Sequence, residues 1–204
     1  MFIELTEILR CPRDHAESYL VAAPITMDGR RIVRGVVGCP ECQAEFPIVD
    51  GVAYFGAPGE ARGPAAGASA PPAPGYDASG LAAFLNLDGP GGYAALVGRA
   101  ARFGEEMVAL IPGVHFVAVN PPAGVVPGAM LSVLVSPRGL PFKSSHLRAV
   151  ALGADCAAPP WLAEAVRVLL PGLRLVAEDE RASSEGLTEL ARGAGLLVGE
   201  KRPG

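Results

Sequence analysis

The segment Cys39-Pro40-Glu41-Cys42 constrains this chain most, because it places two thiols at the ends of one tight turn. Such a C-x-x-C turn can point both thiolates at one metal ion while backbone N–H groups support the sulfurs. A third cysteine, Cys11, is also followed by proline, as in a second half of such a site. Because no secretory signal precedes these cysteines, they indicate a metal site before a disulfide.

The fourth ligand is open between two neighbouring residues. A second cysteine after Cys11 would stand at position 14, where the chain has Asp14, and His15 follows. Imidazole suits zinc in a thiolate site better than a carboxylate does. We therefore predict zinc held by Cys11, His15, Cys39 and Cys42, with Asp14 as the alternative to His15. In the contrary interpretation no metal binds, and the cysteines are small buried apolar residues or a redox pair.

A change of composition divides the chain in two. The run APGEARGPAAGASAPPAPG has no aliphatic residue larger than Ala and is dense in Pro and Gly. It cannot bury enough surface to offset its ordering entropy, so it predicts a linker over residues 57–76. A small domain over residues 1–56 would then precede a larger one over residues 77–204. A domain as small as the first usually needs a staple such as a metal.

Apolar runs and turn dipeptides predict the elements of both parts. In the first we expect a helical turn over 3–9 and strands over 18–23, 31–38 and 46–54, the last broken at Asp50-Gly51. In the second we expect helices over 81–87, 102–110, 161–170 and 185–191, and strands over 93–97, 114–119, 130–135, 147–152, 173–177 and 196–200. This alternation predicts an open, mostly parallel α/β sheet with any ligand at the carboxyl ends of its strands.

Charge and hydropathy exclude several kinds of partner. The net charge is −4, with five basic and eight acidic residues up to Gly56 and eleven and twelve from Asp77 onward. Neither part has the basic excess that phosphate binding needs, so we expect no direct nucleic-acid binding. No stretch approaches the ~20 apolar residues of a membrane span, and the acidic N-terminus does not resemble a signal peptide. We therefore expect a cytoplasmic protein that does not enter a membrane.

The runs LTEILRCP and GCPECQAEFPIVDGVAYF, within residues 2–55, resemble a family of small zinc-ribbon proteins. Its members activate tRNA, rRNA and release-factor methyltransferases, and it has stand-alone bacterial relatives. The resemblance implies a ribbon that binds a protein partner, such as a methyltransferase, and a structural zinc with four protein ligands. Asp14 in place of the second cysteine and Ala53 in place of a usual proline depart from the family pattern.

Two later stretches, GLPFKSSHLRAVALG and WLAEAVRVLLPGLRLVAEDE, resemble class I S-adenosylmethionine methyltransferases of the type 11 group. The stretch that begins at Trp161 is similar to that family's helix, Pro-Gly turn and fifth strand. The combined prediction is an α/β protein with a small zinc-ribbon-like N-terminal domain and a shortened Rossmann-like, mostly parallel sheet. S-adenosylmethionine would be the cofactor implied by this resemblance.

The cofactor-binding parts match that family poorly. With YAALVG as the first strand, Gly98 is the one glycine of a loop that should hold several, and the expected acid is missing. A rival alignment uses residues 84–88 as the strand and Gly89-Pro90-Gly91-Gly92 as the loop. The second strand ends at Asn120, where the family has an acid for the ribose hydroxyls, and a neutral amide is the weaker acceptor. Gly98 and Asn120 are the candidate cofactor-binding residues.

The remaining reactive side chains favour structural roles. His115 lies within a predicted strand and is interpreted as a packed residue, His146 as a solvated loop residue, and Cys156 as a buried thiol. No Ser-His-Asp spacing, paired-carboxylate helix or phosphate loop occurs in the sequence. We therefore name no catalytic residue.

Three functions are compatible with these patterns. The first is a methyltransferase-like protein that is degenerate in cofactor binding and acts as a binding, scaffold or regulatory protein, with the ribbon fused in cis. The second is an active S-adenosylmethionine-dependent methyltransferase with an eroded motif. The third is a zinc-ribbon activator of a separate methyltransferase. The missing glycines and acids favour the first.

Overall fold

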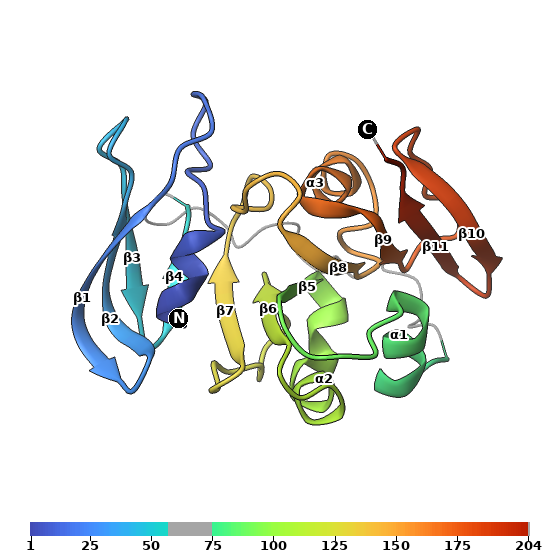
Figure 1. The fold of residues 1–204 in the computed structure, drawn as a ribbon, viewed down its shortest axis with the longest axis horizontal. Helices are drawn as coiled ribbons and strands as arrows, with labels where there is room; N and C mark the ends of the chain where they lie inside the picture. Colours follow the sequence, from blue (N-terminus) through green and yellow to red (C-terminus); the bar gives the residue numbers. More distant parts are fainter. Residues whose placement is uncertain (57–74, 204) are drawn as a thin grey trace.

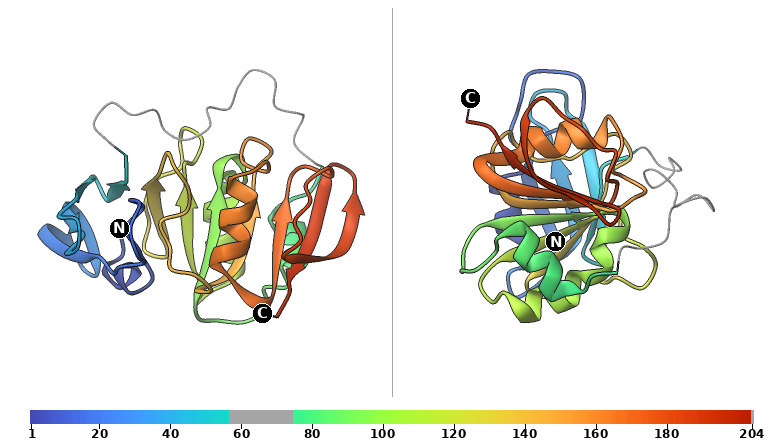
Figure 2. Two further views of the ribbon diagram at one scale, coloured as in Figure 1. Left: turned by 90° about the horizontal axis from the view of Figure 1, so that it is seen from above. Right: turned by 90° about the vertical axis from the view of Figure 1, so that its right-hand side faces the viewer.

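The computed structural model describes residues 1–56 and 75–203, and the strands among them form one continuous eleven-stranded sheet. The strand order is β1-β2-β3-β4-β7-β6-β5-β8-β9-β11-β10 (Figure 1). Seen from above, the strands follow one another across the molecule from the N-terminal to the C-terminal part (Figure 2). Of the linker predicted over residues 57–76, all but the last two residues lie outside the described ranges.

The N-terminal part is an antiparallel meander. It contains the 3-10 helix η1 (Ile3–Glu7), β1 (Val21–Asp28), β2 (Arg31–Gly38), β3 (Glu45–Val49) and β4 (Val52–Tyr54). The chain turns between β3 and β4 at Asp50 and Gly51, both at positive φ, as their hairpin dipeptide predicts. The strand expected over 18–23 instead begins at Val21 and extends to Asp28.

The second part contains five neighbouring parallel strands of the sheet. These are β5 (Tyr93–Val97), β6 (His115–Val119), β7 (Leu131–Val135), β8 (Leu147–Leu152) and β9 (Leu169–Ala177). Each pairs in parallel with its neighbour in the order β7-β6-β5-β8-β9. With the strands numbered by their position in the chain, this is the 3-2-1-4-5 order of a Rossmann fold. The predicted α/β class with a Rossmann-like sheet is confirmed. The complete sheet is mixed, because the strands from β1 to β4 and the strands β9, β11 and β10 pair antiparallel.

Short helices cover the two faces of this sheet. They are α1 (Ala78–Leu85), η2 (Gly98–Phe103), α2 (Gly104–Leu110) and α3 (Trp161–Val168). The buried residues of α1 and α2 belong to one apolar cluster, and those of α3 belong to the cluster on the opposite face. Over the described part of the chain, no helix is long and apolar enough to cross a membrane.

The helix expected over residues 185–191 is wrong. The segment forms β10 (Leu187–Gly193), which pairs antiparallel with β11 (Leu196–Lys201), and β11 in turn pairs antiparallel with β9. The Gly193-Ala194-Gly195 turn, with all three residues at positive φ, returns the chain directly onto β10. Tertiary pairing therefore outweighs the helix propensity of the Leu, Glu, Ala and Arg residues in this segment.

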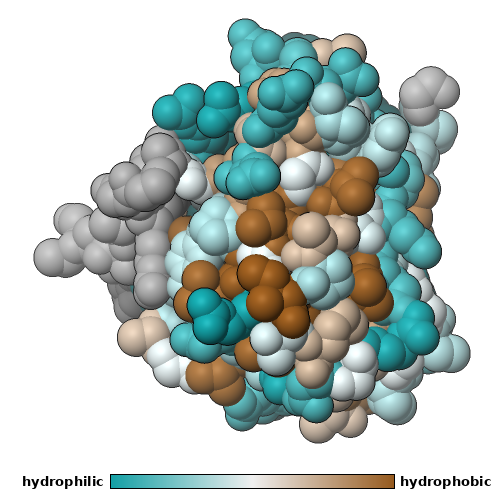
Figure 3. Space-filling model, turned by 90° about the vertical axis from the view of Figure 1, so that its left-hand side faces the viewer, coloured by the Kyte–Doolittle hydropathy of each residue, from teal (hydrophilic) through white to brown (hydrophobic). Residues whose placement is uncertain are grey.

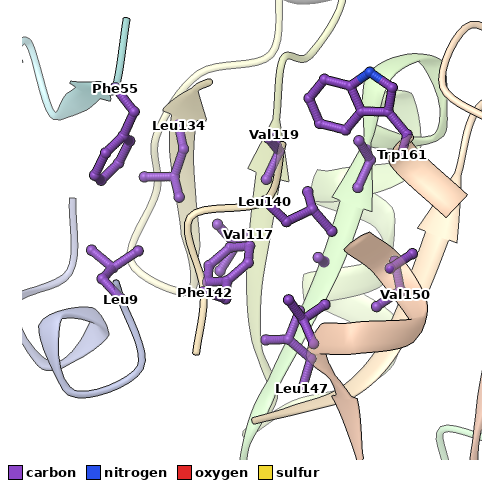
Figure 4. Close-up of a cluster of buried hydrophobic side chains, with 14 of the residues drawn as sticks. Leu9, Phe55, Val117, Val119, Leu134, Leu140, Phe142, Leu147, Val150 and Trp161 are labelled. Atoms are coloured by element: carbon purple, nitrogen blue, oxygen red, sulfur yellow. The ribbon is translucent and has the colours of Figure 1, made fainter. Parts of the chain in front are cut away.

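The N-terminal part joins the Rossmann-like sheet through β4, which pairs in parallel with β7. Val52, Ala53 and Tyr54 lie opposite residues 133–135, and the N–H of Phe55 donates to the carbonyl of Val135 at 2.7 Å. Figure 4 shows the side chains of this junction, with Leu9 and Phe55 on one side and Leu134 and Phe142 on the other. All four are buried in one apolar cluster that extends through both parts.

A second contact joins the same two parts beside the sheet. The N–H of Arg10 donates to the carbonyl of Pro141 at 3.0 Å, and the N–H of Lys143 donates to the carbonyl of Ile8 at 2.8 Å. The Glu17 carboxylate accepts hydrogen bonds from the backbone N–H and the hydroxyl of Ser144. The loop between residues 10 and 18 is therefore attached to the segment that leads into β8.

Candidate functional site

Four side chains gather where the loop after η1 meets the turn between β2 and β3. One ligand atom from each of Cys11, His15, Cys39 and Cys42 lies within 4.8 Å of the other three. The Sγ atoms of Cys11 and Cys42 are 3.7 Å apart, and Cys39 Sγ is 3.6 Å from His15 Nε2. Asp14 is exposed and does not belong to this cluster. The structure thus brings together the four residues favoured from the sequence.

Two turns position these side chains. The N–H of Cys39 donates to the carbonyl of Ala44, and the N–H of Gln43 donates back to the carbonyl of Cys39, each at 2.9 Å. Gln43 has a φ of 56°, which lets the chain close this turn between β2 and β3. On the other side, the N–H of Cys11 donates to the carbonyl of Ser18 and closes the loop that contains His15.

The hydrogen bond of the His15 ring fixes which nitrogen faces the cysteines. Its Nδ1 lies 2.7 Å from the carbonyl oxygen of Ala16. A carbonyl oxygen only accepts, so Nδ1 carries the hydrogen and the lone pair of neutral His15 is on Nε2. Nε2 is the atom that faces Cys39. Histidines that bind zinc through one ring nitrogen commonly donate a hydrogen bond from the other, as Nδ1 of His15 does.

The thiols have different environments. Burial alone would raise the pKa of Cys39, but the backbone N–H groups of Cys42 and Glu41 and the neighbouring thiols lower it to about 7. Burial and the two other thiols raise the pKa of Cys11 to about 12. A hydrogen bond from the backbone N–H of Arg13 lowers it but does not outweigh them. Cys39 therefore gives a thiolate, the form that binds metal, more readily than Cys11 does.

The cluster fits a tetrahedral zinc ion. Zinc bonds of about 2.3 Å to sulfur and 2.0–2.1 Å to nitrogen give edges of roughly 3.6–3.8 Å between ligand atoms. The Cys11–Cys42 and Cys39–His15 separations, 3.7 Å and 3.6 Å, have this length, and the remaining pairs of ligand atoms lie within 4.8 Å of each other. Three thiolates and one imidazole complete four-coordinate zinc, so a metal here would have no open position for water or substrate.

A Rossmann-like fold binds its cofactor at the loop after the first strand, here β5. In this protein the side chain of Asp155 lies against that loop. Gly98 follows β5 with a φ of 59°, and a Cβ added there would lie 2.5 Å from Asp155 Oδ1. The same carboxylate accepts a hydrogen bond from the N–H of Arg99 at 3.0 Å. The approach to the Gly98 backbone is therefore filled by Asp155.

Asn120, the second candidate cofactor residue, is also engaged within the protein. Its Nδ2 donates to the carbonyl of Ser136 at 2.7 Å, and the N–H of Ser136 donates to its Oδ1 at 2.8 Å. This pair of bonds joins the ends of β6 and β7. Asn120 stands where the resembling family has a ribose-binding acid, but here its amide bonds to Ser136 and stabilises the fold.

A buried ionic group at the end of β9 was missed by sequence reasoning. Glu178, whose side chain is fully buried, forms an ion pair with Arg102 at 2.7 Å and accepts a hydrogen bond from the Tyr76 hydroxyl. It also accepts from the N–H of Ala154 at 3.2 Å. Burial and the Glu178 carboxylate raise the pKa of Tyr76. The sequence did show that Glu178 directly follows an apolar strand. It did not show its partners Arg102 and Tyr76, because they come from distant segments.

The other reactive residues have the surroundings expected of structural groups. His115 is buried, stacks on Phe2 with ring centroids 4.5 Å apart, and lies 2.9 Å from the Ser132 hydroxyl. Burial and the nearby N-terminal amine lower its pKa to about 4. Burial and the adjacent Asp155 charge raise the pKa of Cys156. His146 is exposed.

No family model and no curated protein matches the chain. Among solved structures, the antibiotic-resistance methyltransferase Kmr is 21% identical, covering 63% of this chain and 94% of its own, with a TM-score of 0.40. Geranyl diphosphate C-methyltransferase from Streptomyces coelicolor A3(2), in complex with Mg²⁺, geranyl diphosphate and S-adenosyl-L-homocysteine, is 12% identical over 61% and 78%, with a TM-score of 0.40. A putative methyltransferase from an antibiotic biosynthesis pathway of Anabaena variabilis ATCC 29413 is 16% identical over 53% and 47%, with a TM-score of 0.37. Because these identities and scores are low, the likenesses carry no conclusion about activity or substrate.

Proposed function

We propose that this protein is a methyltransferase-like binding protein that does not use S-adenosylmethionine and that carries a structural zinc site in its N-terminal part. The contact of the Asp155 carboxylate with the loop after β5 is the observation that carries the proposal. The Rossmann-like strand order supports the methyltransferase-like architecture, together with the sequence resemblance of residues 161–180. Function depends on the site and not on the fold alone.

The residues at the carboxyl edge do not fit the cofactor. A dinucleotide or nucleoside bound to a Rossmann-like sheet needs close approach to the glycine backbone after the first strand. At Gly98 that approach meets the Asp155 carboxylate, which would also repel an anionic group of a ligand. Asn120 already uses both ends of its amide on Ser136.

The zinc site supports a role in stability. Its four side chains come from two separate loops, residues 11–18 and 39–44. Binding one ion would cross-link them, and the binding free energy of such a site contributes to folding. The ion would supply no chemistry beyond this cross-link, because all four positions are filled by protein ligands.

The junction of the two parts favours the fused arrangement over an activator of a separate methyltransferase. β4 lies between β3 and β7, so both of its edges are paired within the chain. A separate Rossmann-like partner could reach β4 only by displacing β7. A zinc-ribbon activator of a separate methyltransferase would therefore need the two parts of this chain to separate first.

A calorimetric titration of the full chain, loaded with zinc, tests the proposal. We expect no heat of binding from S-adenosylmethionine or S-adenosylhomocysteine at millimolar concentration. Micromolar binding of either compound to the wild-type protein would contradict the proposal and restore the enzyme hypothesis.

The variant Asp155→Ala adds a control in the same titration. If the Asp155 carboxylate alone excludes the cofactor, this variant binds and the wild type does not. If neither binds, the remaining departures at residues 99–102 and 120 are sufficient to exclude it. The circular dichroism spectrum and zinc content of the variant must match those of the wild type for either comparison.

A further inference from the structure

One face of the N-terminal sheet has apolar side chains with no covering layer among the described residues. The opposite face of β2 and β3 carries Ile32, Val37, Phe46 and Ile48, all buried in the core. The uncovered face, here called the outer face, is formed by alternate residues of the three strands. Its apolar members are Val21, Ala23, Ile25, Val36, Pro47 and Val49.

The outer face is exposed enough to bind a partner. Ile25 is 75% exposed, Val21 is 53% exposed and Val49 is 46% exposed. Several of these side chains line a groove of about 410 Å³ that reaches Cys39 and Pro40. Figure 3 shows this end of the molecule, with hydrophobic residues gathered at its centre and hydrophilic ones around them. Contiguous apolar patches of this kind mark interaction sites.

The edge of the sheet is less suited to a partner than its face. β1 is the outermost strand, and Pro24 within it has no N–H to donate to an added strand. The register of β1 against β2 also shifts between Pro24 and Thr26. Proline and bulges are the usual devices that prevent a further strand from adding to an edge. A partner would therefore pack on the face.

Two charged residues lie at opposite ends of the outer face. Glu45 pairs with Gly38 at the end near the cysteines, and Arg34 pairs with Thr26 at the other end. Both are exposed, and neither has an ion-pair partner within the part of the chain that the structure describes. The face thus has an apolar centre with an unpaired acid at one end and an unpaired base at the other.

We propose that the outer face binds the outer face of a second copy of this chain, as a two-fold symmetric dimer. A two-fold axis that lies in the interface and runs across the strands places β2 against β2 of the second copy, in reversed direction. Arg34 then lies over Gly38 of the second copy and beside its Glu45, and the reverse contact occurs at the other end.

The geometry at Gly38 supports this pairing. Gly38 has no side chain, and a Cβ added there would approach only the carbonyl oxygen of Val21, at 3.9 Å. The space above it is therefore open to a guanidinium group from the second copy. Two sheets packed face to face lie about 10 Å apart, which the opposed side chains of Ala23, Val36 and Pro47 would fill.

Sedimentation equilibrium of the full chain in zinc-containing buffer, from low micromolar to several hundred micromolar, measures the dimer. We expect reversible dimerisation. Each of Arg34→Glu and Glu45→Arg creates two like-charge contacts in a symmetric dimer, so each should raise the dissociation constant roughly tenfold or more. The double variant Arg34→Glu/Glu45→Arg restores both contacts with exchanged signs, so its dissociation constant should return toward that of the wild type.

Two further variants complete the test. Ile25→Asp should abolish the dimer, because it puts a charge in place of the most exposed large apolar side chain of the outer face. Arg202→Glu reverses an exposed charge at the far end of the chain and should leave the dissociation constant unchanged. A monomer at all concentrations overturns the proposal, and so does a dimer that is insensitive to Arg34→Glu and Glu45→Arg. Failure of the double variant to recover, with its zinc content intact, would overturn the symmetric pairing.

Discussion

The carboxylate of Asp155 lies directly over Gly98, so that a methyl group added to Gly98 would stand 2.5 Å from Oδ1 and 2.7 Å from the sulfur of Cys156. Gly98 also has a φ of 59°, which disfavours any residue with a Cβ. Any substitution of Gly98 therefore carries two costs, the backbone strain of a positive φ and the steric clash with Asp155 and Cys156. A glycine with nearly the same φ and open surroundings distinguishes the two.

We predict that Gly98→Ala destabilises the fold by more than the ~1–3 kcal/mol typical of a strained backbone conformation alone. Gly29 is the control, because its φ of 58° is nearly the same and an added Cβ would have nothing within 4 Å. Urea unfolding should show a larger loss for Gly98→Ala than for Gly29→Ala. Equal losses would mean that Asp155 does not press on Gly98 in solution.

The Cys/His cluster and the class of the sheet could be predicted from sequence, because the two cysteine-containing turns and the succession of strands and helices are each local patterns. The C-x-x-C turn and the loop with Cys11 and His15 carry their chemistry within a few residues. The apolar alternation of strands and helices likewise indicated the α/β class. The same reasoning failed for residues 187–193, because their pairing with β11 is a tertiary interaction that propensity does not include.

The occupied carboxyl edge could not be predicted, because its members come from distant segments. Asp155 follows β8 and Gly98 follows β5, and only the parallel pairing of these strands brings them together. The pairing of β4 with β7 has the same origin. Both contacts join residues more than fifty positions apart, and neither has a local signature in the sequence.

The ion pair of Glu178 with Arg102 gives a second prediction. Glu178→Gln would leave Arg102 partly buried without its counter-charge, which costs more than the loss of one neutral hydrogen bond. Tyr76→Phe removes only the hydroxyl that donates to Glu178 and should cost about 1 kcal/mol. Thermal unfolding should therefore rank Glu178→Gln as the more destabilising variant. The opposite order would show that the tyrosine hydroxyl, and not the ion pair, holds this group together.

The pH dependence of stability should contain a contribution from Glu164. Burial alone would raise its pKa, but the hydrogen bonds and charge of Arg167, the charge of Arg10 and the N–H of Leu140 outweigh burial and lower it. A carboxyl whose pKa is lowered on folding stabilises the protein above its unfolded pKa of about 4.3. That contribution is lost as the pH falls through the lower folded value.

We therefore expect Glu164→Gln to destabilise the protein at pH 7 by about 1–2 kcal/mol, measured by urea unfolding. The difference from wild type should shrink below about pH 4 and disappear when Glu164 is fully protonated. Glu189→Gln is the control, since Glu189 also pairs with an arginine three residues away but is exposed. Its effect should be small at every pH. If the difference in unfolding free energy between wild type and Glu164→Gln stays constant with pH, the ionised Glu164 carboxylate is not the source of the stabilisation.

The metal cluster supports a prediction about ligand choice. His15→Ala and Cys42→Ala should each lower the zinc content measured by atomic absorption on the purified protein. Asp14→Ala is the matched control, because Asp14 adjoins His15 but stands outside the cluster, and it should retain one zinc per chain. Loss of zinc in Asp14→Ala with retention in His15→Ala would reverse the ligand assignment.

Removing the metal should also loosen the junction between the two parts. Cys11 directly follows Arg10, whose N–H donates to Pro141, and Glu17 in the same loop accepts from Ser144. A chelator should therefore lower the melting temperature and speed hydrogen exchange at Arg10 and Ser144 as well as at Cys39, because the loop that carries these contacts loses its cross-link. The β6 amides lie at the centre of the sheet and serve as the internal control, with exchange expected to change little. Faster exchange confined to residues 39–44 would show that the zinc site stabilises its own turn and not the junction.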